Sequence, residues 1–202
     1  GLVPSGTSAR LTERKKTEEQ LLSLQKELEV LSFKDGLTNI ANRRRFDSSF
    51  ELEWERACGE RKPLSLLLFD VDFFKQYNDL YGHTQGDKCL VDIAQTLSLA
   101  LDGPRDLLAR YGGEEFVVLL PEADAEVARK VAERCQRLLE KKSIVHALSP
   151  HGRCVTVSIG AGTVVPGEQA ERAGFIKAVD RQLYVAKNNG RNRIEHVQLP
   201  EG

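Results

Sequence analysis

The chain has 202 residues, of which 41% are hydrophobic, and a formal net charge of −1 at pH 7. This is enough for one sizeable core, so we expect one domain with an appendage. The charge gives no reason to expect nucleic acid or an anionic membrane as a partner, and no apolar run reaches the ~20 residues that span a bilayer. The four cysteines show no Cys-x-x-Cys spacing, which favours a reducing, cytoplasmic location over a disulfide frame or a zinc site.

The first 34 residues differ from the rest. Because the chain has no Met, we expect a processed piece of a longer protein, with a cloning or protease-site remnant at residues 1–7. Residues 8–34 are predicted to form a helix with an apolar stripe at Leu21, Leu24, Leu28 and Leu31. The stripe fits a helix packed on its own domain, or a helix that pairs in parallel with a second copy below a missing sensor domain. We prefer the second interpretation, since pairing would bring two copies of the following domain together.

From residue 35 onward, helix and strand patterns alternate. Helices are predicted where apolar residues recur at helical spacing: from Phe46 to Ala57 with an end near Gly59, from Leu90 to Leu101, from Val127 to Leu138, and from Ile176 to Ala186. Strands are predicted near residues 64–71, 106–111, 115–120, 154–164 and 192–199. This order predicts an α/β (α+β) fold in which helices flank a central mixed sheet behind an N-terminal helical extension.

Two acidic segments adjoin predicted strands. The apolar run at 64–69, typical of a central strand buried on both faces, ends in Asp70-Val71-Asp72. A predicted hairpin carries Gly112-Gly113-Glu114-Glu115 at its tip, where we expect glycine to take positive φ angles and to let a ligand approach the backbone. If the two strands are neighbours, Asp70 and Glu114 converge, and hard carboxylate oxygens suit Mg²⁺. A solvated strand end is the alternative explanation of Asp70 taken alone.

The run Gly-Gly-Glu-Glu-Phe at residues 112–116 resembles the signature of the GGDEF family, the diguanylate cyclases, with Glu at the third position. Other blocks resemble further family segments in the same order: residues 35–39 with 42–44, 69–75, 78–79, 82–83, 86–87, 157–160 and 187–193. The resemblance covers residues 35–199. It implies the palm-like fold that nucleotide cyclases share with polymerases.

The resemblance implies that two GTP molecules, one on each of two facing domains, condense to cyclic di-GMP and two pyrophosphates. Each 3′-hydroxyl would attack the α-phosphate of the other nucleotide, so turnover would require a homodimer. Two Mg²⁺ ions per half-site, with Mn²⁺ as a substitute, would bridge the attacking oxygen, the α-phosphate and the pyrophosphate. The alternatives are a catalytically silent GTP-binding regulatory domain and a cyclic di-GMP receptor.

By position in the family pattern, Asp70, Glu114 and the backbone carbonyl of Val71 are expected to hold metal. Glu115 would hold the second metal or help to remove the 3′-hydroxyl proton. Which Glu is the base stays open, because the metal itself lowers the pKa of the hydroxyl. A charge that only shapes the hairpin is the alternative for Glu115. Asp72 is expected to be structural.

The guanine base is expected to be read by Asn78 and Asp87, because a carboxylate accepts from both N1–H and the exocyclic amine of guanine. Since Asp87 also stands just before a predicted helix, an N-terminal cap or a partner of the helix dipole is the alternative role. His83 would touch the base or ribose, or be an ordinary loop histidine.

The triphosphate is expected to be held by two cations and a backbone loop. Lys187 and Arg191 match the family pattern, although cations in a final helical turn also stabilise the helix dipole without any ligand. Phe73 and Phe74 would offer backbone amides to the same phosphates, with Lys75 assisting.

The family's product-inhibition site, Arg-x-x-Asp, falls in this chain on Gly103-Pro104-Arg105-Asp106. Asp106 is present, but Gly103 stands at the arginine position and Arg105 is out of frame. Glycine cannot fork onto a phosphate or stack on a guanine. We therefore expect a degenerate inhibitory site with weak or absent feedback inhibition. A cyclic di-GMP receptor would also need the arginine that is missing here.

Overall fold

The computed structural model describes residues 6–202 and divides after Lys34 into two units. The first is helix α1 (Gly6–Leu31). Of the remnant predicted at residues 1–7, residues 1–5 lie outside the described part, and the other two belong to this helix. Its exposed leucines are Leu11, Leu21, Leu22, Leu24 and Leu28, at 55–65%; the side chain of Leu31 is outside the described part. In the part of the chain described, no helix is long and apolar enough to cross a membrane.

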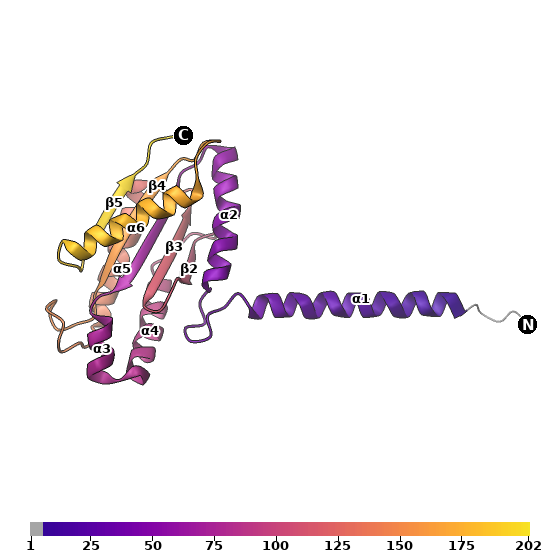
Figure 1. The fold of residues 1–202 in the computed structure, drawn as a ribbon, viewed down its shortest axis with the longest axis horizontal. Helices are drawn as coiled ribbons and strands as arrows, with labels where there is room; N and C mark the ends of the chain where they lie inside the picture. Colours follow the sequence, from indigo (N-terminus) through magenta and orange to yellow (C-terminus); the bar gives the residue numbers. More distant parts are fainter. Residues whose placement is uncertain (1–5) are drawn as a thin grey trace, which may run out of the picture. The chain divides into compact units, whose positions relative to one another are not determined.

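The second unit is built on a five-stranded mixed sheet (Figure 1). Its strands are β1 (Leu64–Val71), β2 (Leu107–Arg110), β3 (Glu115–Pro121), β4 (Val157–Val164) and β5 (Ile194–Gln198), in the order β2-β3-β1-β4-β5. Strand β5 runs parallel to β4, and the other neighbours are antiparallel. The apolar run at 64–69 therefore lies in the central strand, buried on both faces as predicted.

Helices cover both faces of this sheet (Figure 1). On one face, α2 (Arg43–Glu60) and α6 (Arg172–Asn188) belong to the same apolar cluster as Leu66 and Leu68. On the other, α4 (His83–Ser98) and α5 (Ala125–Lys142) pack with Leu67 and Phe69. Because side chains alternate along a strand, Asp70 continues the face of Leu66 and Leu68. Its carboxylate therefore points to the α6 side.

Several boundaries differ from the predictions. Helix α2 continues through Gly59 to Glu60, and its C-cap Arg61, with a left-handed φ of 51°, makes a capping bond to the Ala57 carbonyl. Helix α4 begins at His83, and a helix that we did not predict, α3 (Phe74–Tyr81), precedes it. Gly82 separates α3 from α4 with a φ of 87°, an angle that glycine adopts at little cost. Phe74, Tyr77 and Tyr81 recur at helical spacing, but α3 has only 8 residues, which is too short a run to identify a helix by period.

Candidate active site

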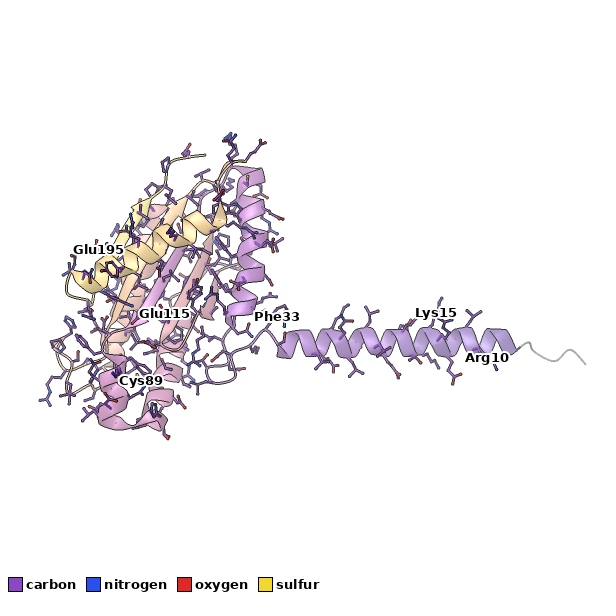
Figure 2. The ribbon with its side chains drawn as sticks, in the orientation of Figure 1. Arg10, Lys15, Phe33, Cys89, Glu115 and Glu195 are labelled. Atoms are coloured by element: carbon purple, nitrogen blue, oxygen red, sulfur yellow. The ribbon has the colours of Figure 1, made fainter. Side chains whose placement is uncertain are left out.

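Strands β1 and β3 bring two carboxylates together at one end of the sheet. Their register pairs Asp70 with Glu115, and directly opposed residues share a face; Figure 2 labels Glu115. From the same side, the Nζ of Lys187 at the end of α6 donates to Oδ2 of Asp70 at 2.8 Å. Three residues distant in sequence thus form one charged group.

The electrostatics of this group favour an added cation. Burial raises the pKa of Asp70 above its ordinary value despite the opposing effect of Lys187, and the charge of Glu114 raises it further. Burial also raises the pKa of Glu115, with Asp70 as the next cause. Carboxylates with raised pKa values repel one another in the ionised state, and their oxygens suit a hard divalent ion. Among the described residues, however, no group of three or more Asp, Glu, His or Cys forms a ready metal cage.

The signature turn connects β2 to β3. Glu114 stands in the turn, one residue before β3, and its carbonyl accepts from the Val71 N–H at 3.2 Å. Neither Gly112 nor Gly113 has a positive φ, so the prediction of positive φ angles in this turn was wrong. The turn is closed instead by a hydrogen bond of 2.8 Å from the Tyr111 N–H to the Glu115 carbonyl. A Cβ on Gly113 would meet nothing within 4 Å, which leaves room for a ligand.

A surface cavity of about 380 Å³ opens between this turn and helices α3 and α4. Its lining includes Glu114 and five of the predicted nucleotide-binding residues, Phe74, Lys75, Asn78, His83 and Asp87. The predicted base-binding residues therefore meet beside one of the predicted metal ligands. Asp87 lies inside α4, whose N-cap is Gly82, so the alternative role of Asp87 as the cap was wrong.

Asn78 has the features of a ligand-binding side chain. Its Oδ1 is buried and has no hydrogen-bond partner in the described part of the chain, which is costly for a polar atom unless a ligand supplies a donor. A Cβ on Gly86 would lie 1.8 Å from this oxygen. Glycine at position 86 thus leaves the space that Asn78 occupies.

The loop between β1 and α3 has a conformation that favours anions. Phe73, the N-cap of α3, has a left-handed backbone with φ 55° and ψ 33°, and no side chain caps the helix. A left-handed residue followed by helical Phe74 turns successive N–H groups to one concave side, which binds anions, and the first N–H groups of a helix have no intrahelical acceptor. The guanidinium of Arg191 lies 4.9 Å from the centre of the Phe73 ring. Arg191 therefore lies beside this loop.

Asp72 has a structural position. It is 2% exposed, and its carboxylate accepts hydrogen bonds from Thr156 at 2.8 Å, from Ser158 at 2.6 Å and from the Asn192 N–H at 3.0 Å. These bonds join the end of β1 to β4 and to the loop that carries Arg191.

No role was assigned from the sequence to Arg110, which lies two residues before the signature. Its Nε and Nη2 donate to the Gly113 carbonyl at 3.1 and 2.9 Å, and its Nη1 lies 3.2 Å from Oδ2 of Asp35. The same Asp35 oxygen accepts from the N–H and the hydroxyl of Thr38 at 2.9 and 2.7 Å. The sequence carries no signal for this contact beyond the position of Asp35 in the first family-like block and of Arg110 close to the Gly-Gly pair.

The segment at the inhibitory position is folded on itself. The Gly103 N–H donates to Oδ2 of Asp106 at 2.8 Å, and a Cβ on Gly103 would lie 2.5 Å from Oδ1 of the same side chain. Arg105 pairs with Glu53 at 3.0 Å and Glu122 at 2.9 Å. Both charged residues are thus engaged within the domain.

Comparisons with known proteins agree on one family. Residues 32–193 match the family described as "Diguanylate cyclase, GGDEF domain". The chain is 41% identical over 185 residues to diguanylate cyclase DgcM of Escherichia coli, covering 91% of this chain and 41% of that protein. It is 41% identical over 140 residues to diguanylate cyclase A of Treponema denticola, covering 68% and 36%. The chain thus spans about two fifths of the length of these curated relatives.

Two solved structures are similar over most of the chain. One is the coiled coil and GGDEF domain of DgcB from Caulobacter crescentus in complex with c-di-GMP, with a TM-score of 0.80, 26% identity and coverage of 96% of this chain and 100% of that one. The other is the active GGEEF domain of a diguanylate cyclase from Vibrio cholerae, with a TM-score of 0.69, 29% identity and coverage of 80% and 99%.

Proposed function

Because the chain belongs to the GGDEF family of diguanylate cyclases, we propose that it condenses two GTP molecules to cyclic di-GMP and two pyrophosphates. The observation that carries this proposal is the facing pair Asp70 and Glu115, two partly buried carboxylates with raised pKa values at the ends of neighbouring strands. A cavity lined by Asn78 and Asp87 adjoins Glu114, the residue before Glu115. We favour an active enzyme over a silent GTP-binding domain because each proposed role has its residue.

The proposed cofactors are two divalent cations such as Mg²⁺, with Mn²⁺ as a substitute, because hard carboxylate oxygens suit such ions. Asp70, Glu114 and the Val71 carbonyl are the proposed oxygen ligands, and Glu115 adds its charge from the neighbouring strand. When bound, the ions lower the pKa of the attacking hydroxyl and neutralise charge on the phosphoryl group. The raised pKa of Glu115 brings it closer to the working pH, which favours Glu115 as the acceptor of the 3′-hydroxyl proton.

The remaining residues orient the nucleotide. Asn78 and Asp87 would accept hydrogen bonds from the edge of the guanine base, and His83 lines the same cavity. The β- and γ-phosphates would be held by the N–H groups of Phe73 and Phe74. The side chains of Lys75, of Lys187 in the last turn of α6 and of Arg191 in the loop after it would add positive charge. Such positioning and charge neutralisation supply most of the catalysis in phosphoryl transfer.

Turnover would need two copies of the domain. Each cavity would bind one GTP, and each bound nucleotide would supply the hydroxyl that attacks the other. The exposed leucines of α1 support pairing of two chains through this helix.

The direct test is incubation with GTP and Mg²⁺, followed by chromatographic separation of the products. We expect cyclic di-GMP and pyrophosphate in a ratio of one to two, none from Asp70→Asn, and full activity from Glu133→Gln, a carboxylate change on the surface of α5. ATP should give no cyclic product. Binding of GTP without turnover in a dimeric sample would instead support the silent regulatory domain.

A further inference from the structure

His146 lies between α5 and β4, in a segment to which the proposed reaction assigns no role. Its side chain is fully buried, with 0% exposed, and its Nε2 is 3.0 Å from the carbonyl oxygen of Phe73. Because a carbonyl oxygen only accepts hydrogen bonds, Nε2 must carry the proton and donate it. The imidazole therefore reaches the proposed phosphate loop from inside the protein.

Two tyrosines of α3 hold the ring in place. Tyr77 packs edge-on against it, with centroids 5.3 Å apart and planes at 89°, and Tyr81 lies 6.3 Å away. The Tyr81 hydroxyl accepts from the Ala147 N–H at 2.9 Å, and the His146 N–H donates to the Arg153 carbonyl at 2.8 Å. The direction of the Nε2–H bond is thus set by packing.

Stability alone does not explain an imidazole at this position. The Phe73 carbonyl already accepts the Tyr77 N–H at 3.0 Å in the first turn of α3. Nδ1 of His146 is buried without a partner in the described part of the chain, and an unpartnered buried acceptor lowers stability. An apolar ring of similar size would fill the same space without that cost.

The bond to Phe73 has a geometric consequence for the next residue. A trans peptide is planar, so its C=O and the following N–H point in opposite directions. The two donors to the Phe73 carbonyl, the Tyr77 N–H and His146 Nε2, therefore also fix the direction of the Phe74 N–H, which points away from His146. This constraint acts on a left-handed, non-glycine residue with φ 55°, a conformation that persists only where its surroundings hold it.

We propose that His146 is a positioning residue for GTP, which aims the Phe74 N–H at the triphosphate through its hydrogen bond to the Phe73 carbonyl. This inference rests on the proposed function, because it requires that the loop bind the triphosphate. It requires no contact between His146 and the nucleotide.

The test compares two variants. His146→Gln keeps an amide donor near the place of Nε2, whereas His146→Phe keeps a ring without a donor. Titration with 3′-deoxy-GTP and Mg²⁺ reports binding without turnover, because this analogue lacks the attacking hydroxyl. For His146→Phe we expect a Kd for the analogue and a KM for GTP about three- to tenfold higher, the worth of one hydrogen bond, with kcat little changed and an equal or higher Tm. His146→Gln should bind like the wild type.

His196→Phe is the matched control. It removes a partly buried imidazole that is 3.0 Å from Thr163 on β4, away from the loop, and should leave the Kd unchanged. Equal affinity of wild type and His146→Phe, or a loss that parallels a lower Tm in both His146 variants, would overturn the positioning role alone. If His146→Phe does not fold, His146→Asn, whose shorter amide cannot reach Phe73, replaces it in the comparison with His146→Gln. A wild type that neither binds the analogue nor forms product contradicts the proposed function, and this inference with it.

Discussion

Arg110 binds Asp35 and the signature turn at the same time. Its Nη1 lies 3.2 Å from Oδ2 of Asp35, while Nε and Nη2 donate to the Gly113 carbonyl. The Arg110 N–H also donates to the Ala41 carbonyl at 2.8 Å. Asp35 is the first residue of the second unit, so one guanidinium connects the start of this unit to the turn that carries Glu114.

Replacement of Arg110 by Lys should loosen the turn. A single ammonium group cannot serve both the Gly113 carbonyl and Asp35 as the planar fork of arginine does. We expect kcat/KM for GTP to fall about tenfold, the worth of one or two hydrogen bonds, in a steady-state assay of pyrophosphate release. Arg137→Lys, an exposed arginine on α5, should not change it. An unchanged rate in both variants would refute the role of Arg110.

The Asp35 contacts should make stability depend on pH. Burial alone would raise the pKa of Asp35, but hydrogen bonds from Thr38 and the charge of Arg110 bring it below its ordinary value. The folded state then binds fewer protons than the unfolded state, so the stabilisation is present above the unfolded pKa of about 4 and is lost as the pH falls through the folded value. In urea unfolding, Asp35→Asn should cost about 1–2 kcal/mol at neutral pH. The difference from the wild type should shrink below about pH 4, and a constant difference would contradict this assignment.

Asp70 and Glu115 should give stability the opposite pH dependence from that of Asp35. Their pKa values are raised, by burial first, so the folded state binds more protons than the unfolded state between the ordinary and the raised values. Stability therefore falls as the pH rises through that window. Without divalent metal at neutral pH, Glu115→Gln should raise the Tm by a few degrees, on the scale of about 1 kcal/mol, and should lose cyclase activity. Addition of Mg²⁺ should raise the Tm of the wild type more than that of this variant. If Glu115→Gln has a lower Tm than the wild type in EDTA, burial and repulsion of the acidic side chains are not the cause of the raised pKa values.

Product inhibition should be weak. Gly103 stands where the family has arginine, and Asp106 instead accepts from the Gly103 N–H. Gly103→Arg alone should not restore inhibition, because its Cβ would collide with the Asp106 carboxylate. Initial rates with added cyclic di-GMP test this directly. Sub-micromolar product binding that disappears in Asp106→Ala would show that the site works without its arginine.

Activity should depend on pairing of two chains. We expect the rate per chain to rise with protein concentration, in parallel with the dimer fraction measured by light scattering. Leu24→Glu should shift both curves to higher concentration because it places a charge in the exposed apolar stripe of α1. Ser23→Glu adds the same charge at the neighbouring position, outside the apolar stripe, and should shift the two curves much less. A rate per chain that is independent of concentration down to the monomer would exclude a dimeric reaction centre.

Much of the fold was predictable because its signals are local. The five strands, the central place of β1 and the helices of period 3.6 followed from apolar spacing. Helix α3 was not predicted because it has only 8 residues and Gly82 divides it from α4, so the helical spacing of Phe74, Tyr77 and Tyr81 is too short to be recognised as a period. The turn at Gly112 and Gly113 closes without positive φ, which no property of a glycine pair reveals in advance.

The sequence by itself determined the family, the strands and the acidic, amide and basic residues of the candidate site, because each is written in short runs or periodic patterns. Only the tertiary structure decided which of them meet. Packing of both sheet faces sets the register that places Asp70 opposite Glu115, and it brings Lys187 to Asp70 across 117 residues. The contact of His146 with Phe73 spans 73 residues, and it depends on the close packing of α3 against the segment before β4, which leaves no pattern in the chain.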